Sequence, residues 1–182
     1  MRWIQVSRWV GLFLMVALTA ISVSAQNSDR GQHNRRTVRA RLTGYQEVPS
    51  ISTSGRGEFG ARLDDATIDF RLNYSELEGE VLQAHIHVGQ RSVNGGITVF
   101  LCTNLGNGPA GTPPCPQEGA VTGVRMAADI VGPAGQGIEV GEFEEVLKAI
   151  RSGNTYVNVH TVKHPGGEIR GQIRTDSDRN PH

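Results

Sequence analysis

The chain has 182 residues, which is enough for one domain with a hydrophobic core of its own. Its 18 basic side chains balance its 18 acidic ones. This balance argues against a nucleic-acid partner that is bound through an overall excess of positive charge.

The first 25 residues have the pattern of a secretory signal peptide. Arg2 and Arg8 supply the positive start, residues 10–23 are mostly apolar, and positions 23–25 have the composition of a cleavage site. The apolar run is short for a membrane span. We therefore expect cleavage after Ala25, a secreted or periplasmic mature protein, and no membrane span once the signal is removed. The alternative is an uncleaved N-terminal anchor.

Residues 26–36 are polar and lack an apolar period, so we predict a disordered lead-in. From residue 37 to residue 175 the chain reads as one domain, and residues 176–182 form a polar tail. Within the domain, alternating apolar and polar residues between turn signals predict short strands. Seven or eight are expected, over 37–43, 58–63, 67–74, 81–88, 97–102, 121–128, 155–162 and 168–174, with the weakest pattern over 121–128.

One helix is predicted over 142–152. Apolar residues recur there at helical spacing, and Gly153 is the expected stop. Seven or eight short strands with a single short helix indicate an all-β fold, either a sandwich or a barrel.

The two cysteines, Cys102 and Cys115, flank a stretch rich in proline and glycine. An even cysteine count in an exported chain favours a disulfide over free thiols. Closing a loop of this size stabilises the fold by roughly 3 kcal/mol in the chain-entropy picture. The alternative is a pair of reduced, buried thiols.

Histidines occupy alternate positions in two of the predicted strands. His85 and His87 share one side of the strand over 81–88, because side chains alternate along a strand. His160 lies on the corresponding side of the strand over 155–162. If the two strands are neighbours, the three imidazoles converge, and three histidines are a ligand set used for zinc and copper. Because imidazole binds metal in its neutral form, we expect affinity to fall as the pH drops through about 6.5.

Other polar residues are candidates for supporting roles. His164, Glu168, Glu47 or water could supply a fourth ligand, and Asn158 could hydrogen-bond to an imidazole. We interpret Glu168 and Arg170 as a cross-strand ion pair. The alternative for the histidines is a solvated polar face on which they hydrogen-bond to neighbours. The sequence has no Gly-x-Ser-x-Gly, no phosphate-binding loop and no Cys-x-x-Cys, so we assign no catalytic residue.

Three motifs carry a resemblance to a known family. They are LTGYQEVP at 42–49, AHIHVG at 84–89, and YVNVHT with PGGEIRGQI between 156 and 173. In this order they resemble the CHRD domain, which is named after chordin, over roughly 37–174. The resemblance implies an antiparallel β-sandwich of immunoglobulin-like or superoxide-dismutase-like Greek-key character, located outside the cytoplasm. It implies no established enzymatic activity.

Three functions compete at this point. The one that we favour is an exported CHRD-domain binding module without enzymatic activity, whose partner is an extracellular protein or a zinc or copper ion. The second is a metalloenzyme of superoxide-dismutase-like character, which is an analogy at the level of the fold. The third is a structural protein of the cell surface or matrix, in which the histidines only hold the sheet together.

Overall fold

The computed structural model describes Met1 and residues 36–175. Residues 2–25 of the predicted signal peptide, almost all of the lead-in and the polar tail lie outside the described residues. The helix is α1 (Phe143–Arg151), and short 3-10 turns cover Gly44–Gln46, Ala127–Asp129 and Ala134–Gln136. The strands are β1 (Arg36–Thr43), β2 (Arg56–Leu63), β3 (Ile68–Ser75), β4 (Val81–Val88), β5 (Ile97–Thr103), β6 (Gly119–Arg125), β7 (Thr155–Thr161), β8 (Ile169–Gln172) and β9 (Arg174–Thr175).

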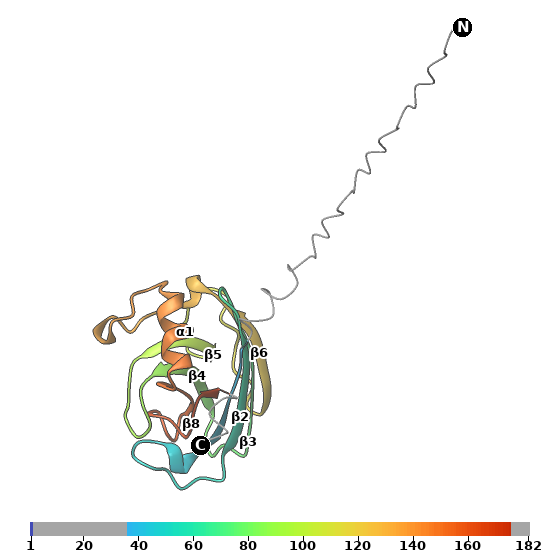
Figure 1. Ribbon diagram of the computed structural model, residues 1–182. Coiled ribbons are helices and arrows are strands. Elements are labelled where there is room, and N and C mark those ends of the chain that lie inside the picture. The colour runs from blue at the N-terminus through green and yellow to red at the C-terminus, as the bar shows by residue number, and fades with distance from the viewer. Residues whose placement is uncertain (2–35, 176–182) are drawn as a thin grey trace.

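The strands form one antiparallel sheet in the order β5-β4-β7-β8-β1-β2-β3-β6, and β9 pairs with β1. The sheet curls, so β1, β2, β3 and β6 lie opposite β4, β5 and β8 (Figure 1). Arg125, in the edge strand β6, bridges to the other edge strand. Its Nε donates to the carbonyl of Phe100 at 2.8 Å and its Nη2 to that of Leu101 at 3.1 Å, which ties the two edges together without a strand ladder.

The core lies on the inner face of the curled sheet. In β1, β2 and β3 buried and exposed residues alternate, as expected for strands with one face on a core. The helix α1 adds four buried residues at the predicted spacing and lies at one end of the sheet (Figure 1): Phe143, Val146, Leu147 and Ile150. The outward faces of the strands are therefore the surfaces available for function.

The prediction of an all-β antiparallel fold with one short helix is confirmed. The described residues contain nine strands, because the strand expected over 168–174 is interrupted at Ile173 and continues as β9. The strand expected over 121–128 is β6, which begins at Gly119 and ends at Arg125, and a 3-10 turn begins at Ala127. The finer prediction of a Greek-key sandwich stays a prediction, since the strands belong to one continuous sheet.

Cys102 and Cys115 form the predicted disulfide, with their Cα atoms 5.0 Å apart. The bond closes the loop after β5 at its base. A disulfide persists in oxidising surroundings, so it fits an extracellular protein. None of the described helices has the length and apolar character that crossing a membrane requires.

Candidate metal centre

The three predicted ligands lie on the outer face of the part of the sheet formed by β4, β7 and β8. Here β7 pairs with both β4 and β8. The ladder places His85 opposite Asn158, and Asn158 opposite Arg170. His87 is opposite Tyr156, one step along. We call this set of outward residues of β4, β7 and β8 the histidine face.

The histidines converge as predicted. One nitrogen from each of His85, His87 and His160 lies within 4.8 Å of the other two. His85 is 0% exposed, and His87 and His160 are each 7% exposed. These outward side chains are therefore buried and not solvated, while the hydrogen bonds to neighbours that the alternative expects are present for His87 and His160.

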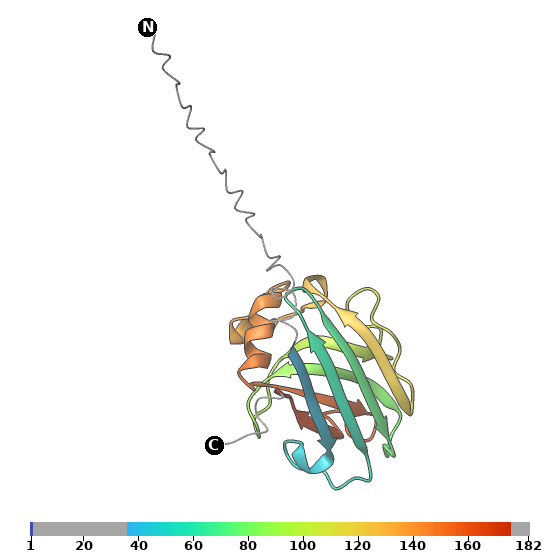
Figure 2. The ribbon, with the colours of Figure 1, turned by 45° about the vertical axis from the view of Figure 1, so that its right-hand side comes forward.

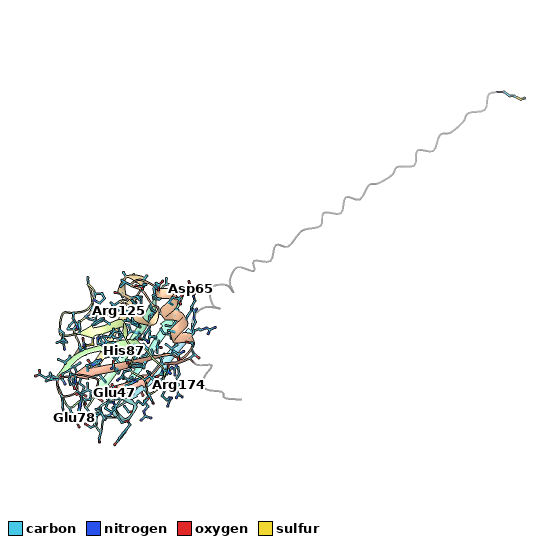
Figure 3. All side chains as sticks on the ribbon, turned by 90° about the vertical axis from the view of Figure 1, so that its left-hand side faces the viewer. Glu47, Asp65, Glu78, His87, Arg125 and Arg174 are labelled. Atoms are coloured by element: carbon cyan, nitrogen blue, oxygen red, sulfur yellow. A yellow bond between two sulfur atoms is a disulfide. The ribbon has the colours of Figure 1, made fainter. Side chains whose placement is uncertain are left out.

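Loops that connect the strands cover the histidine face. The Nδ1 of His87 is 2.9 Å from the carbonyl oxygen of Gly95, in the loop between β4 and β5. The Nδ1 of His160 is 2.9 Å from the carbonyl oxygen of Pro165, in the turn after β7. Figure 3 looks onto this half of the molecule, with His87 and Glu47 labelled. The loops thus hold the imidazoles as well as burying them.

These hydrogen bonds bear on where the protons are. A carbonyl oxygen only accepts, so Nδ1 carries the proton in His87, and its neutral ring keeps a lone pair on Nε2. In His160 the carbonyl of Pro165 at Nδ1 and the Oδ1 of Asn158 at Nε2 compete for the single proton of the neutral ring. The His87 Nε2 is buried and has no hydrogen-bond partner among the described residues. Metal-binding histidines commonly donate their second nitrogen to a backbone carbonyl in this way.

The spacing of the nitrogens suits a small cation. His85 Nδ1 and His160 Nε2 are 3.3 Å apart. Two nitrogens bound to a tetrahedral zinc ion at 2.0–2.1 Å are about 3.3–3.4 Å apart. In the metal-free protein a proton on His85 Nδ1 can fill this gap as a hydrogen bond. Bringing His87 to the same separation needs a movement of at most about 1.5 Å.

Burial keeps all three imidazoles neutral. Desolvation lowers the pKa of His85 to about 2, and the neighbouring His160 and His87 lower it further. Desolvation also lowers the pKa of His87 to about 4 and lowers that of His160. Neutral imidazole is the form that binds metal. Proton competition for a metal therefore begins below the pH of about 6.5 expected from an ordinary histidine.

An aromatic stack supports the site from one side. The ring of His87 is parallel to that of Tyr156, with centroids 4.8 Å apart. The guanidinium of Arg170 lies 3.4 Å from the Tyr156 ring centroid. Arg170 also donates to the carbonyls of Gln90 and Val93. The stack therefore fixes the His87 ring and anchors the loop that covers it.

The candidates for a fourth ligand are placed differently. His164 Nε2 lies 3.7 Å from a carboxylate oxygen of Glu78 and is outside the histidine group. Glu168 is fully buried and accepts hydrogen bonds from Thr53, Thr161 and the backbone of Glu78. Both side chains are thus engaged away from the three imidazoles.

The expected ion pair between Glu168 and Arg170 is absent from the described ion pairs and hydrogen bonds. The two oxygens of Glu168 are taken by neutral donors, whereas Arg170 binds the 89–96 loop. The carboxylate that interacts electrostatically with Arg170 is Glu47. Assigning the pair from alternation along one strand was therefore wrong.

Glu47 lies near the histidine group but, like His164 and Glu168, is outside the set of ligand atoms that come within 4.8 Å of one another. It is 5% exposed, and its Oε1 has no close hydrogen-bond partner among the described residues, although the Asn158 side chain interacts with the carboxylate and lowers its pKa. Oε1 and the amide of Asn158 both lie against Gly167, where an added Cβ would collide with them. Burial raises the Glu47 pKa to about 7, although Arg170 opposes the shift. A cavity of about 270 Å³ opens beside Glu47 and Arg170.

Asn158, predicted to support an imidazole, contacts one. Its Oδ1 is 3.0 Å from His160 Nε2. Sequence reasoning missed the roles of Tyr156 and Arg170 and of the carbonyls of Gly95 and Pro165. Tyr156 and Arg170 could have been found from alternation, since they share the outward face of β7 and β8 with Asn158.

Comparison with known families supports the resemblance. The family model of the CHRD domain matches residues 38–173. This chain belongs to the CHRD domain family. The match spans β1 to β8 and therefore includes the whole histidine face. No curated protein and no solved structure is significantly similar to the chain.

Proposed function

We propose that this CHRD domain is an exported binding module that holds one zinc or copper ion on His85, His87 and His160. The observation that carries the proposal is the group of buried, neutral imidazoles, with His85 Nδ1 and His160 Nε2 3.3 Å apart. Nitrogen ligands at this spacing suit zinc and copper better than calcium or magnesium, which prefer oxygen.

The remaining coordination position goes to water or to Glu47. Glu47 is the more informative candidate, because its carboxylate is buried and Asn158 contacts both this carboxylate and His160. An anionic ligand would also be stabilised by the cation, which offsets the cost of burying its charge. Asn158 positions His160, and no residue is assigned a catalytic role.

We also propose that the protein is exported after signal cleavage and that its sheet is a Greek-key sandwich. The signal-peptide pattern of residues 1–25 and the disulfide support a secreted or periplasmic protein. Intact Met1 at the N-terminus of secreted protein would contradict cleavage. The Greek-key sandwich that the CHRD resemblance implies belongs to the same proposal, and a sheet closed by a full strand ladder between β5 and β6 would contradict it.

Elemental analysis tests the metal directly. Protein exported by a host cell and purified without a histidine tag should carry close to one equivalent of zinc or copper per chain. The variant His87→Ala should carry much less. Protein that neither carries a metal nor takes one up after dialysis against zinc or copper would overturn the proposal.

A further inference from the structure

The opposite outer face of the sheet is rich in arginine. Arg39 on β1 is directly opposite Arg174 on β9 and, on its other side, Gly60 on β2. Gly60 in turn is opposite Arg71 on β3. Two further exposed arginines lie two residues along the same strands: Arg41 and Arg62. We call Arg39, Arg41, Arg62, Arg71 and Arg174 the arginine face.

The domain neutralises this face only in part: Arg41 is directly opposite the exposed Glu58 and Arg62 is directly opposite the exposed Asp69, whereas the row that contains Arg174, Arg39 and Arg71 holds no acid. Within residues 36–175 none of the five arginines has an ion-pair partner, whereas nearby Arg56 pairs with Glu76. The cross-strand pair of Arg39 and Arg174 is a like-charge pair, which destabilises a sheet. The fold therefore bears an electrostatic cost here that an anionic partner would remove.

The face is open along one row. Arg174, Arg39, Gly60 and Arg71 follow one another across four neighbouring strands. A Cβ at Gly60 would meet nothing within 4 Å, so a gap separates Arg39 from Arg71. These two residues are two strands apart, or about 10 Å. No other described element crosses in front of β1, β2 and β3 (Figure 2).

The side chains on this face indicate the kind of partner. All five cations are arginines, whose guanidinium binds carboxylate and sulfate groups through two parallel hydrogen bonds. No aromatic side chain is exposed on this face in the described residues, so the stacking used to bind single-stranded nucleic acid is missing. Val124, at the β6 edge, is its one large exposed apolar residue, too little to insert into a bilayer.

We propose that the arginine face binds a linear acidic polysaccharide, whose carboxylate or sulfate groups lie along the row Arg174–Arg39–Gly60–Arg71. The face and the histidine face have no residue in common. This inference therefore goes beyond the proposed metal site, and either can fail without the other.

Binding of the whole mature protein to polygalacturonate and to dextran sulfate, with uncharged dextran as reference, tests the proposal. The triple variant Arg39→Gln/Arg71→Gln/Arg174→Gln should bind both polyanions at least about tenfold more weakly at low salt, with a shallower salt dependence. The corresponding triple lysine variant keeps the charge but loses the paired hydrogen bonds, so its affinity should be intermediate.

A matched control separates the face from the net charge. The variant Arg91→Gln/Lys148→Gln/Lys163→Gln removes three charges from other surfaces and should bind within about twofold of wild type. An equal loss in this control, or no binding by wild type, would overturn the proposal. Tighter arginine-dependent binding to phosphatidylglycerol vesicles or to single-stranded DNA would also overturn it, in favour of a bilayer or a nucleic acid.

Discussion

The two outer faces of the sheet are both polar in sequence and differ in structure. On β4, β7 and β8 the outward side chains include three histidines that are at most 7% exposed. On β1, β2 and β3 the outward arginines are exposed to solvent. The loops make the difference, because those after β4 and β7 fold over their own strands and hydrogen-bond to His87 and His160.

The comparison shows what covering a polar surface does. Under the loops, burial lowers the pKa of histidines, which stay neutral, and raises the pKa of Glu47 to about 7, so its carboxyl is only partly ionised at neutral pH. In solvent, the arginines of the open face stay charged. The covered face is therefore suited to binding an ion tightly, and the open face to binding a charged polymer. Substitutions on the covered face should therefore change stability more than comparable substitutions on the open face.

The largest difference between the two faces is expected when an arginine is replaced by methionine. Replacing the buried Arg170 by Met leaves Glu47 and the carbonyls of Gln90 and Val93 without their partner. This should reduce the free energy of unfolding by about 3–5 kcal/mol. Replacing Arg71 by Met on the open face should change it by no more than about 0.5 kcal/mol. Urea unfolding of both variants measures this, and equal losses would show that Arg170 contributes no more than a surface residue.

Acid should destabilise the metal-free protein through the histidine face. His85 and His87 have folded-state pKa values of about 2 and about 4, below the unfolded value of 6.5. Between these values the unfolded chain binds protons that the folded one does not, so stability is lost as the pH falls below 6.5. From pH 7 to pH 5 the two groups together account for about 2–4 kcal/mol.

The measurement is urea unfolding at pH 5 to 8 in the presence of a chelator. In the variant His87→Gln the free energy of unfolding should depend less steeply on pH than in wild type, because one of the two titrating histidines is missing. A slope that is identical in the variant would mean that His87 is protonated equally in the folded and unfolded states.

Two glycines provide a backbone test. Gly167 has φ of +126° and its missing Cβ leaves room for Glu47 and Asn158. Gly167→Ala should therefore cost about 2–3 kcal/mol. Gly60→Ala, on the open face, meets no neighbour and should be neutral or stabilising by up to about 1 kcal/mol. Thermal unfolding separates the two, and a neutral Gly167→Ala would show that Glu47 is not held against this glycine.

The smallest effect is expected for Glu47. Its pKa is raised to about 7 from a usual 4.5, so its contribution to stability is fully present below pH 4.5 and is lost as the pH rises through about 7. The metal-free variant Glu47→Gln should be more stable than wild type by about 1–2 kcal/mol at pH 8 and by little at pH 5. Equal stability at both values would show that Glu47 is ionised without cost.

Much of the fold and of the histidine face could be predicted from the sequence. Alternation along 81–88 and 155–162 placed His85, His87 and His160 on one side of their strands, and the pairing of β4 with β7 brought them together. The disulfide followed from the even cysteine count. These features depend on local periodicity and chain composition, which the sequence carries directly.

The environment of the site could not be predicted in this way. Alternation tells which side of a strand a residue occupies, and it says nothing about a loop that folds over that side. Glu168 illustrates this, because its backbone position suggested Arg170 as partner, whereas Thr53 and Thr161 bind its carboxylate. Contacts across more than a hundred residues of sequence, such as Thr53 to Glu168, depend on the tertiary fold.

The most direct test of the account is calorimetric titration of zinc, and separately of reduced or oxidised copper, into metal-free wild type, His87→Ala and His164→Ala at pH 7. Wild type and His164→Ala should each bind one ion saturably, and a hundredfold excess over the dissociation constant should stabilise them by roughly 2.7 kcal/mol. His87→Ala should lose most of the affinity. Absence of saturable binding in wild type, or undiminished affinity in His87→Ala, would contradict the assignment of the histidine face as a metal site.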